Sequence, residues 1–282
     1  MRRRVIAWGL SGDPSFDAVC RELVRTRTPH AVVDQRFDTR AEFDDAGAFF
    51  ARPYSAAALH DQILWGVDDA ARRNAQLAQY ALFAQLEIAD VLVANRPSAA
   101  ATNSSRPYQA ERMRAHGFAV PETLVTTSPD DARAFIERHG EVIYKSVGDV
   151  RSAGTRVAVG SEPRLGDIAS APTQFQACIS GVDWRVHVVG DDVFACEIRA
   201  FEIRAARLPA AVAARCHALA HALGLPLAGI DLRRTDEGEW YGYEVNAAPT
   251  FAYYERETRQ PLTTAVVALL AAAASATGEL AA

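Results

Sequence analysis

Two acidic residues and one amide near the end of the chain have the types and spacing of a divalent-metal site. Asp231 lies in one strand-like stretch, and Glu244 and Asn246 lie in the next, with Asp236-Glu237-Gly238 between them as a turn. If the last two of these turn residues form the loop, Asp231 faces Glu244 across the hairpin. Two carboxylates that face each other destabilise the pair of strands unless another group offsets their repulsion. Asn246 is two residues beyond Glu244 and therefore on the same face of its strand. Oxygen ligands of this kind suit Mg²⁺ or Mn²⁺, although an ordinary hairpin with solvated acids would have the same spacing.

A lysine at the end of an apolar stretch is a candidate phosphate contact. Residues 141–146 are predicted to form a strand that ends at Lys145, the only lysine in the chain, and Ser146. The polar loop that follows contains Gly148 and Gly154, whose backbone N–H groups can surround a phosphate while the lysine supplies positive charge. The sequence is not a Walker A motif, and a surface hairpin with an exposed lysine is the alternative.

Two further strand-like stretches carry charges on one face. Asp183 and Arg185 share a face of the first, and Glu197 and Arg199 share a face of the second. An ordinary half-buried sheet with one solvated face gives this pattern. The functional alternative is a cluster of arginines that binds phosphate or carboxylate.

The elements that must position these residues begin with an open α/β sheet at the N-terminus. A strand at residues 5–10 leads into a helix that begins at Pro14, with Asp13 or Ser11 as its N-cap, and a second strand follows. The first turn lacks the G-x-G-x-x-G pattern, so a nicotinamide dinucleotide is not expected. Turn-forming residues at Asn95-Arg96-Pro97-Ser98 mark the end of this domain.

Composition sets the broad class of protein. The 282 residues are 49% hydrophobic and 23% charged, which is typical of a soluble globular chain of two or three domains. The net charge of −5 gives no reason to expect nucleic acid as a partner. Neither the short apolar run at the N-terminus nor the alanine-rich tail reaches the ~20 residues of a membrane span, so no membrane association is expected. Four widely spaced cysteines without a C-x-x-C motif indicate reduced thiols, as in a cytoplasmic protein.

The order of these features resembles the ATP-grasp superfamily, and within it the RimK and glutathione-synthetase-like ligases. The motifs that carry the resemblance run from residue 95 to the C-terminus, and they are N-R-P-S, G-F-A-V-P-E-T, the strand ending at Lys145 with its glycine loop, Q-A-C-I-S-G-V-D-W-R-V, and G-I-D-L followed by Y-E-V-N. The resemblance implies an α/β (α+β) fold. A Rossmann-like pre-ATP-grasp domain at 1–94 would precede a first ATP-grasp lobe at 95–175 and a second lobe at 176–282.

The resemblance also implies a role for each candidate residue. Asp231, Glu244 and Asn246 are similar to magnesium ligands, and Lys145 to the lysine on the ATP phosphates, under a lid that runs from Ser146 through Gly148 and Gly154. The adenine hinge would be Gln176, Ala177, Cys178 and Ile179, acting mainly through the backbone of Ala177 and Ile179, with Asp183 near the ribose. Arg185, Arg199 and Arg204 would surround the γ-phosphate and the acyl group. Arg106 stands where relatives have a lysine, and the segment between Arg199 and Leu208 is shorter than in many relatives.

The activity that the resemblance implies is ATP- and Mg-dependent ligation of a carboxylate to an amine. The acid would be activated as an acyl phosphate, and the substrates would be small molecules or peptides. A ligase that modifies a ribosomal peptide, as in the graspetides, and a degenerate module that binds nucleotide without turnover are the alternatives. A homo-oligomer is a further expectation, because ligases of this type are frequently dimers or tetramers.

Overall fold

The computed structural model of the chain describes residues 3–35, 44–55, 69–101, 105–146, 154–160, 165–200 and 202–279. Their contacts divide the chain into two compact units. Unit 1 comprises Met1–Ala101, Arg185–Gly229 and Asn246–Ala282, and unit 2 comprises Thr102–Trp184 and Ile230–Val245. Each unit therefore draws on segments that are far apart in the sequence.

Unit 1 contains a parallel sheet built from the N-terminal segment. Its strand order is β2-β1-β3-β4, and the pairs along the sheet are parallel. The strands are β1 Arg4–Gly9, β2 His30–Asp34, β3 Ala46–Arg52 and β4 Leu92–Ala94. Helix α1, Pro14–Arg25, follows β1, and Asp13 caps it by accepting hydrogen bonds from the backbone N–H groups of Ser15 and Phe16 at 2.9 and 2.8 Å. The N-cap expected from the sequence is thus confirmed.

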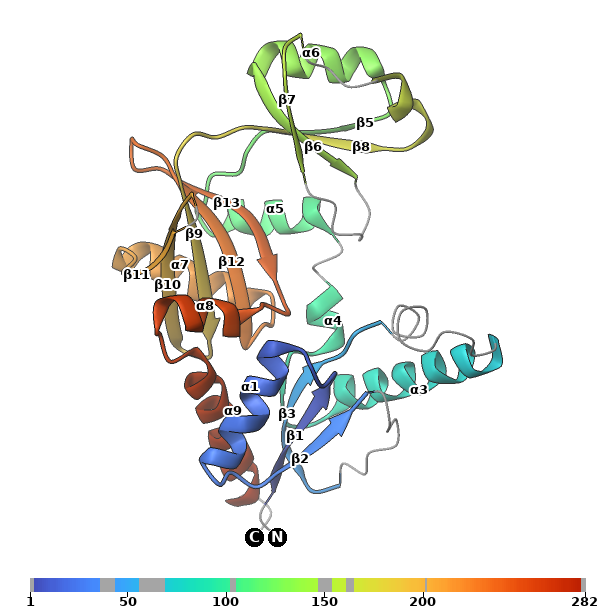
Figure 1. Cartoon of the computed structure of the whole chain (residues 1–282), viewed down its shortest axis with the longest axis vertical. Helices are drawn as coiled ribbons and strands as arrows, with labels where there is room; N and C mark the ends of the chain where they lie inside the picture. Colours follow the sequence, from blue (N-terminus) through green and yellow to red (C-terminus); the bar gives the residue numbers. More distant parts are fainter. Residues whose placement is uncertain are drawn as a thin grey trace. The chain divides into compact units, whose positions relative to one another are not determined.

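Helices cover both faces of this sheet (Figure 1). Val5 and Ala7 of β1 pack against α1 and against α9, Leu262–Glu279. Ile6 and Trp8 point to the opposite face and pack against α3, Asp69–Ile88. The alternation along β1 explains why its residues are apolar without interruption, because both faces of the strand are buried.

Unit 2 contains a four-stranded antiparallel sheet with one helix packed on it. Its strand order is β5-β8-β6-β7. The elements are β5 Thr123–Thr126, α6 Pro129–His139, β6 Glu141–Ser146, β7 Thr155–Ala158, the 3₁₀ helix η2 Leu165–Ser170 and β8 Thr173–Ala177. Phe135 and Ile136 of α6 meet Val142, Val157 and Phe175 of the sheet in a buried core.

A third sheet has the order β11-β10-β9-β12-β13. Its strands are β9 Val182–Val189, β10 Asp192–Arg199, β11 Glu202–Ala206, β12 Leu227–Arg234 and β13 Trp240–Asn246. The division between the units falls within β9, within β12 and before the last residue of β13. The remaining helices are α4 Pro97–Ala100, α5 Arg106–Ala115, α7 Ala210–Ala222 and α8 Phe251–Thr258. The α/β class expected from the sequence is confirmed.

The four cysteines are free thiols, and Cys196 and Cys216 are buried. Among the described residues, no helix combines the length and the hydropathy that crossing a membrane requires.

Candidate functional site

The hairpin that carries Asp231 and Glu244 differs from the expected one at its turn. The backbone N–H of Thr235 donates to the Glu239 carbonyl at 2.9 Å, and the N–H of Gly238 donates to the Thr235 carbonyl at 3.0 Å. Three residues therefore form the loop, with Gly238 in the left-handed region at φ 89°. The two-residue loop, which was the condition for placing Asp231 directly opposite Glu244, is therefore not the one that forms.

Asn246 is held by its own turn. It is 9% exposed, and its side-chain oxygen accepts a hydrogen bond from the Ala248 N–H at 2.8 Å. In the described part of the chain, no group of three histidine, cysteine or acidic side chains is placed to hold a metal ion. The predicted ligand set of Asp231, Glu244 and Asn246 is of a different kind, because it contains two acids and one amide. Its donor types, two carboxylates and one amide oxygen, fit Mg²⁺.

Unit 2 brings two of the predicted site residues, Arg106 and Glu244, near Lys145. This lysine is half-buried on β6, and burial lowers its pKa to about 8. The positive charge of Arg106, at the start of α5, lowers the pKa further, and the negative charge of Glu244 partly offsets both effects. Two cations held near one carboxylate in a partly desolvated setting form an environment suited to a polyphosphate with a bound metal ion.

The predicted phosphate loop is only partly described. Ser146 is the last residue of β6, and Gly148 lies outside the described residues. Gly154 precedes β7, and a Cβ at this position would lie 2.5 Å from the Ile143 Cγ2 atom. The Ile143 side chain therefore leaves no room for a Cβ at position 154 without a shift.

The predicted hinge is tied to other parts of unit 2. The backbone N–H of Ala177 donates to the Glu122 carbonyl at 2.9 Å, and the N–H of Cys178 donates to the Glu141 carbonyl at 3.2 Å. The backbone of Ala177, which the resemblance implies as an adenine contact, thus already uses its N–H group within the protein. Gln176 is 5% exposed, and its amide lies 3.4 Å from the Thr123 hydroxyl.

Arg233 joins the hinge to the predicted ribose contact, and sequence reasoning missed it. Its guanidinium donates to the Asp183 carboxylate at 2.7 Å and to the Ile179 carbonyl at 2.6 Å. The same guanidinium lies over the Tyr243 ring, 5.3 Å from its centroid. The hydrogen bond to Asp183 raises the pKa of Arg233, so the cation persists at any ordinary pH.

The three arginines expected near the transferred phosphate have different environments in unit 1. Arg199 and Arg204 lie on the β10–β11 hairpin, where each faces an acid across the strands and also pairs with an acid of its own strand, Glu197 and Glu202 respectively. Their side chains are 67% and 76% exposed. Arg185 on β9 is only 5% exposed. The structure thus brings Arg199 and Arg204 together in an exposed row of alternating charges and places Arg185 in a buried setting.

Arg185 has two neighbours that sequence reasoning did not identify. Its guanidinium lies over the Tyr254 ring at 5.2 Å, and the ring of His187, two residues along β9, lies 5.1 Å from the same tyrosine. His187 is 1% exposed, and burial, assisted by the charge of Arg185, lowers its pKa to about 3. The histidine is therefore neutral at physiological pH. The alternation of Asp183, Arg185 and His187 along one strand was the available signal.

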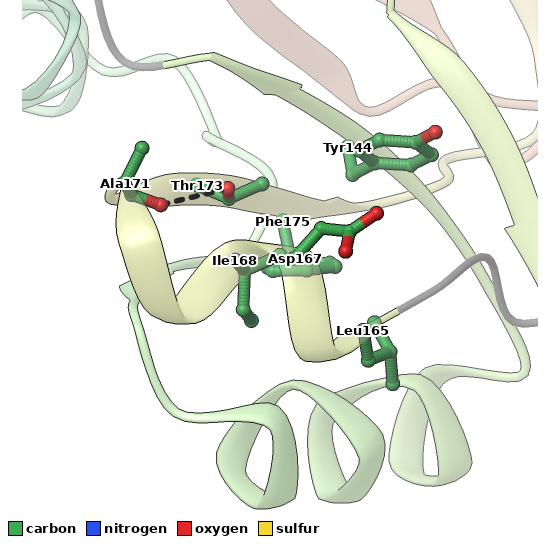
Figure 2. A pocket seen from close by; sticks show the side chains of 7 residues that line it. All are labelled: Tyr144, Leu165, Asp167, Ile168, Ala171, Thr173 and Phe175. Carbon is green, nitrogen blue, oxygen red and sulfur yellow. Dashed lines mark hydrogen bonds between the residues drawn. The ribbon is translucent and has the colours of Figure 1, made fainter.

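Unit 2 also has a cavity of about 360 Å³ on the face of its sheet opposite Lys145. Lys145 pairs with Gln174 on one face, whereas Tyr144 pairs with Phe175 on the other. The cavity is lined by Tyr144, Leu165, Asp167, Ile168, Ala171, Thr173 and Phe175. Figure 2 shows the Asp167 carboxylate pointing toward the Tyr144 ring, with the remaining lining mostly apolar. None of the predicted site residues lines this cavity.

No protein-family model and no curated protein matches the chain. Solved structures match it over nearly its whole length. The ATP-grasp ligase PsnB complexed with minimal precursor has a TM-score of 0.83 at 22% identity, covering 97% of this chain and 99% of PsnB. The macrocyclase MdnC bound with precursor peptide MdnA, from Microcystis aeruginosa MRC, has a TM-score of 0.82 at 16% identity, covering 95% and 99%. D-alanyl-alanine synthetase A from Vibrio cholerae has a TM-score of 0.68 at 12% identity, covering 97% and 99%.

These likenesses show that the chain has the fold of the ATP-grasp ligases. The mixed α/β fold of the ATP-grasp ligases, expected from the order of the sequence motifs, is thereby confirmed.

Proposed function

We propose that this protein is an ATP- and Mg-dependent ligase that activates a carboxylate as an acyl phosphate and joins it to an amine, releasing ADP and phosphate. The observation that carries the proposal is the grouping of Lys145, Arg106 and Glu244 in unit 2 of a chain with the ATP-grasp fold. Transfer of a phosphoryl group needs little covalent chemistry from the protein, and charge neutralisation supplies most of the catalysis.

Each residue then has a defined task. Lys145 and Arg106 bind the phosphates, helped by the loop from Ser146 to Gly154. Asp231, Glu244 and Asn246 would hold Mg²⁺, which supplies charge neutralisation at the transferring phosphoryl group. The segment from Gln176 to Ile179 orients the adenine. Asp183, fixed by Arg233, faces the ribose.

The three arginines act on the acid substrate. Arg185, buried and stacked on Tyr254, is the one whose position is fixed before substrate binds, whereas Arg199 and Arg204 must leave their acidic partners to reach a phosphoryl or acyl oxygen. A preorganised guanidinium stabilises an oxyanion at a lower reorganisation cost, so Arg185 has the larger share of this task.

Peptides are the substrate class that we propose for the site. PsnB and MdnC, which have TM-scores of 0.83 and 0.82, are solved with precursor peptides, whereas D-alanyl-alanine synthetase has a lower score of 0.68. PsnB is also solved with Mg and ADP. This ordering favours the graspetide-type reaction over a small-molecule ligation. A small-molecule acid and amine remain the alternative within the same chemistry.

The proposed organisation follows the sequence motifs. Residues 1–94 form a Rossmann-like pre-ATP-grasp domain, 95–175 the first lobe and 176–282 the second, in a RimK-like cytoplasmic enzyme. The parallel order β2-β1-β3-β4 supports the first assignment.

A non-catalytic nucleotide-binding module is the second candidate. The pairing of Arg199 and Arg204 with acids of their own strands favours it, because paired arginines have less free charge for a transferring phosphoryl group. Such a module would bind ATP and release no ADP.

The proposal is tested by incubating the protein with ATP, Mg²⁺ and synthetic peptides that contain acidic and hydroxyl- or amine-bearing side chains. Release of ADP together with the loss of one water per bond in the peptide mass supports a peptide ligase. Binding of Mg–ATP without ADP release for any peptide or amino acid identifies the second candidate. Absence of nucleotide binding contradicts both.

A further inference from the structure

Strand β13 is the edge strand of the five-stranded sheet, and the backbone of Val245 lies between the two predicted metal ligands Glu244 and Asn246. An edge strand has backbone groups without a strand partner on one side. Val245 is fully buried, so its N–H and C=O groups on that side need a partner other than bulk water.

The side chain of Gln109, on α5, supplies both partners. Its Nε2 atom donates to the Val245 carbonyl at 2.8 Å, and its Oε1 atom accepts from the Val245 N–H at 3.0 Å. Gln109 is 2% exposed. A primary amide thus takes the place of a missing strand at one residue, with one donor and one acceptor each matched.

Further contacts hold the same segment to β13 in unit 2. A Cβ on Gly242 would lie 2.6 Å from the Met113 sulfur, so this glycine admits the methionine of α5. The backbone of Ala119 accepts from the Gly242 N–H at 2.8 Å and donates to the Trp240 carbonyl at 3.0 Å. The contacts along the edge of β13 toward Glu244 therefore come first from the Ala119 backbone, then from Met113 and then from Gln109.

Helix α5 also carries Arg106, three residues before Gln109 and hence on a neighbouring position of the helix surface. The charge of Arg106 acts on Lys145 together with that of Glu244. The same helix therefore both holds the backbone beside Glu244 and presents a cation to the same group of charges.

We propose that Gln109 is a positioning residue of the nucleotide site, which fixes the backbone at Val245 so that the adjacent Glu244 side chain is set for Mg²⁺. Gln109 touches neither the metal nor the nucleotide and acts through Val245. This inference rests on the proposed function, because it needs a metal-dependent nucleotide site at Glu244. Replacing a residue that orients a metal ligand without binding the metal itself commonly lowers metal affinity by about 10- to 100-fold.

The first test is Gln109→Met, which keeps the length of the side chain and removes both hydrogen bonds. ATP is titrated into the protein by calorimetry with and without Mg²⁺. We expect metal-free affinity to stay within about 3-fold of wild type and the affinity gained from Mg²⁺ to fall by about 10-fold or more. Gln260→Met is the matched control, because it removes an amide hydrogen bond to the Ala195 carbonyl, 3.1 Å long in unit 1, and should leave both affinities unchanged.

The second test is Gln109→Glu. The ionised carboxylate accepts from the Val245 N–H but repels its carbonyl, whereas the protonated carboxyl can both accept and donate as the amide does. The affinity gained from Mg²⁺, relative to wild type at the same pH, should therefore recover as the pH is lowered toward 5. A variant that merely disturbs packing would show no such recovery.

Three results would overturn the inference. The first is that folded Gln109→Met gains as much ATP affinity from Mg²⁺ as wild type does. The second is that Gln109→Met loses ATP affinity by the same factor with and without Mg²⁺. The third is that the affinity gained from Mg²⁺ in Gln109→Glu does not recover at low pH. This third result is sufficient to reject the inference if Gln109→Met fails to fold. Wild-type protein that binds no Mg–ATP refutes the proposed function itself, and the inference with it.

Discussion

Arg233 donates from its guanidinium to the Asp183 carboxylate at 2.7 Å, although fifty residues separate the two in sequence. The same cation donates to the Ile179 carbonyl at 2.6 Å and lies over the Tyr243 ring. The side chain of Arg233 is only 16% exposed, so these contacts are partly shielded from solvent. One arginine therefore fixes both the end of the proposed adenine hinge and the carboxylate proposed to face the ribose.

Replacing Arg233 with methionine should weaken ATP binding by about 10-fold, or ~1.4 kcal/mol. The methionine keeps part of the apolar contact with Tyr243 but leaves the Ile179 carbonyl and the Asp183 carboxylate without their donor. Equilibrium titration of a fluorescent ATP analogue measures the effect. Arg234→Met is the control, because Arg234 is adjacent and exposed and should bind ATP as wild type does. Equal affinities in the two variants would show that Arg233 has no part in the hinge.

The pKa of Lys145 predicts a pH dependence of nucleotide binding. Burial and the charge of Arg106 bring this pKa to about 8 in the protein without nucleotide, with Glu244 acting in the opposite direction. Bound phosphates favour the charged lysine and raise its pKa. Below pH 8 the lysine is charged in both states, whereas above pH 8 binding requires uptake of a proton. ATP affinity should therefore fall above pH 8, by at most about 10-fold per pH unit.

Calorimetry at pH 8.5 in buffers of different ionisation enthalpy measures this proton uptake directly. Lys145→Arg is the control, because the guanidinium stays charged across the whole range and should bind ATP with little change from pH 7 to pH 9. Constant wild-type affinity over that range would contradict a role for Lys145 at the phosphates.

Local chemistry made some of these features predictable from the sequence. The cap at Asp13 was predictable because Asp-Pro before a helix satisfies N–H groups two and three residues away. The loop between β12 and β13 was not, because Asp236-Glu237-Gly238 suits a two-residue and a three-residue loop equally. That single residue changes which side chains face each other across the hairpin.

The contacts missed from the sequence are those between distant segments. Gln109 and Val245 are 136 residues apart, and Arg233 and Ile179 are 54 apart. Nothing in the spacing of either pair indicates a partner, because each depends on where a helix or a strand end lies in the folded unit. The residue types of the proposed metal site were recognisable, whereas the side chains that hold their backbone were not.

The burial of His187 predicts a loss of stability in acid. Burial lowers the pKa of this histidine to about 3 in the folded protein, whereas the unfolded chain has the ordinary value of 6.5. Between these values the unfolded state binds a proton that the folded state does not, so the free energy of unfolding falls as the pH falls. The contribution is about 1.4 kcal/mol per pH unit, or about 2 kcal/mol between pH 7 and pH 5.

Urea unfolding of wild type and of His187→Phe at pH 7, 6 and 5 isolates this contribution. Phenylalanine can keep the ring contact with Tyr254 and has no proton to bind. The variant should lose less stability than wild type over the same range, whatever its stability at pH 7. Parallel pH profiles would show that the histidine titrates normally and is accessible in the folded protein.

The last prediction concerns the proposed metal ligands themselves. Glu244→Gln and Asp231→Asn preserve size and remove one negative charge each, and both residues are only half-buried. We expect turnover to be lost, because an amide replaces a carboxylate that neutralises the metal ion, while the free energy of unfolding changes by less than about 1 kcal/mol. ADP release and urea unfolding, measured on the same preparations, separate the two effects.

Glu239→Gln is the matched control for this pair, because it makes the same chemical change at an exposed position directly before β13. Its ADP release and its stability should equal those of wild type. If Glu244→Gln retains full turnover, the carboxylate has no role at the metal ion. If Glu244→Gln unfolds, the acid stabilises the hairpin instead, and its proximity to Lys145 is then an ion-pairing feature of unit 2 and not part of a nucleotide site.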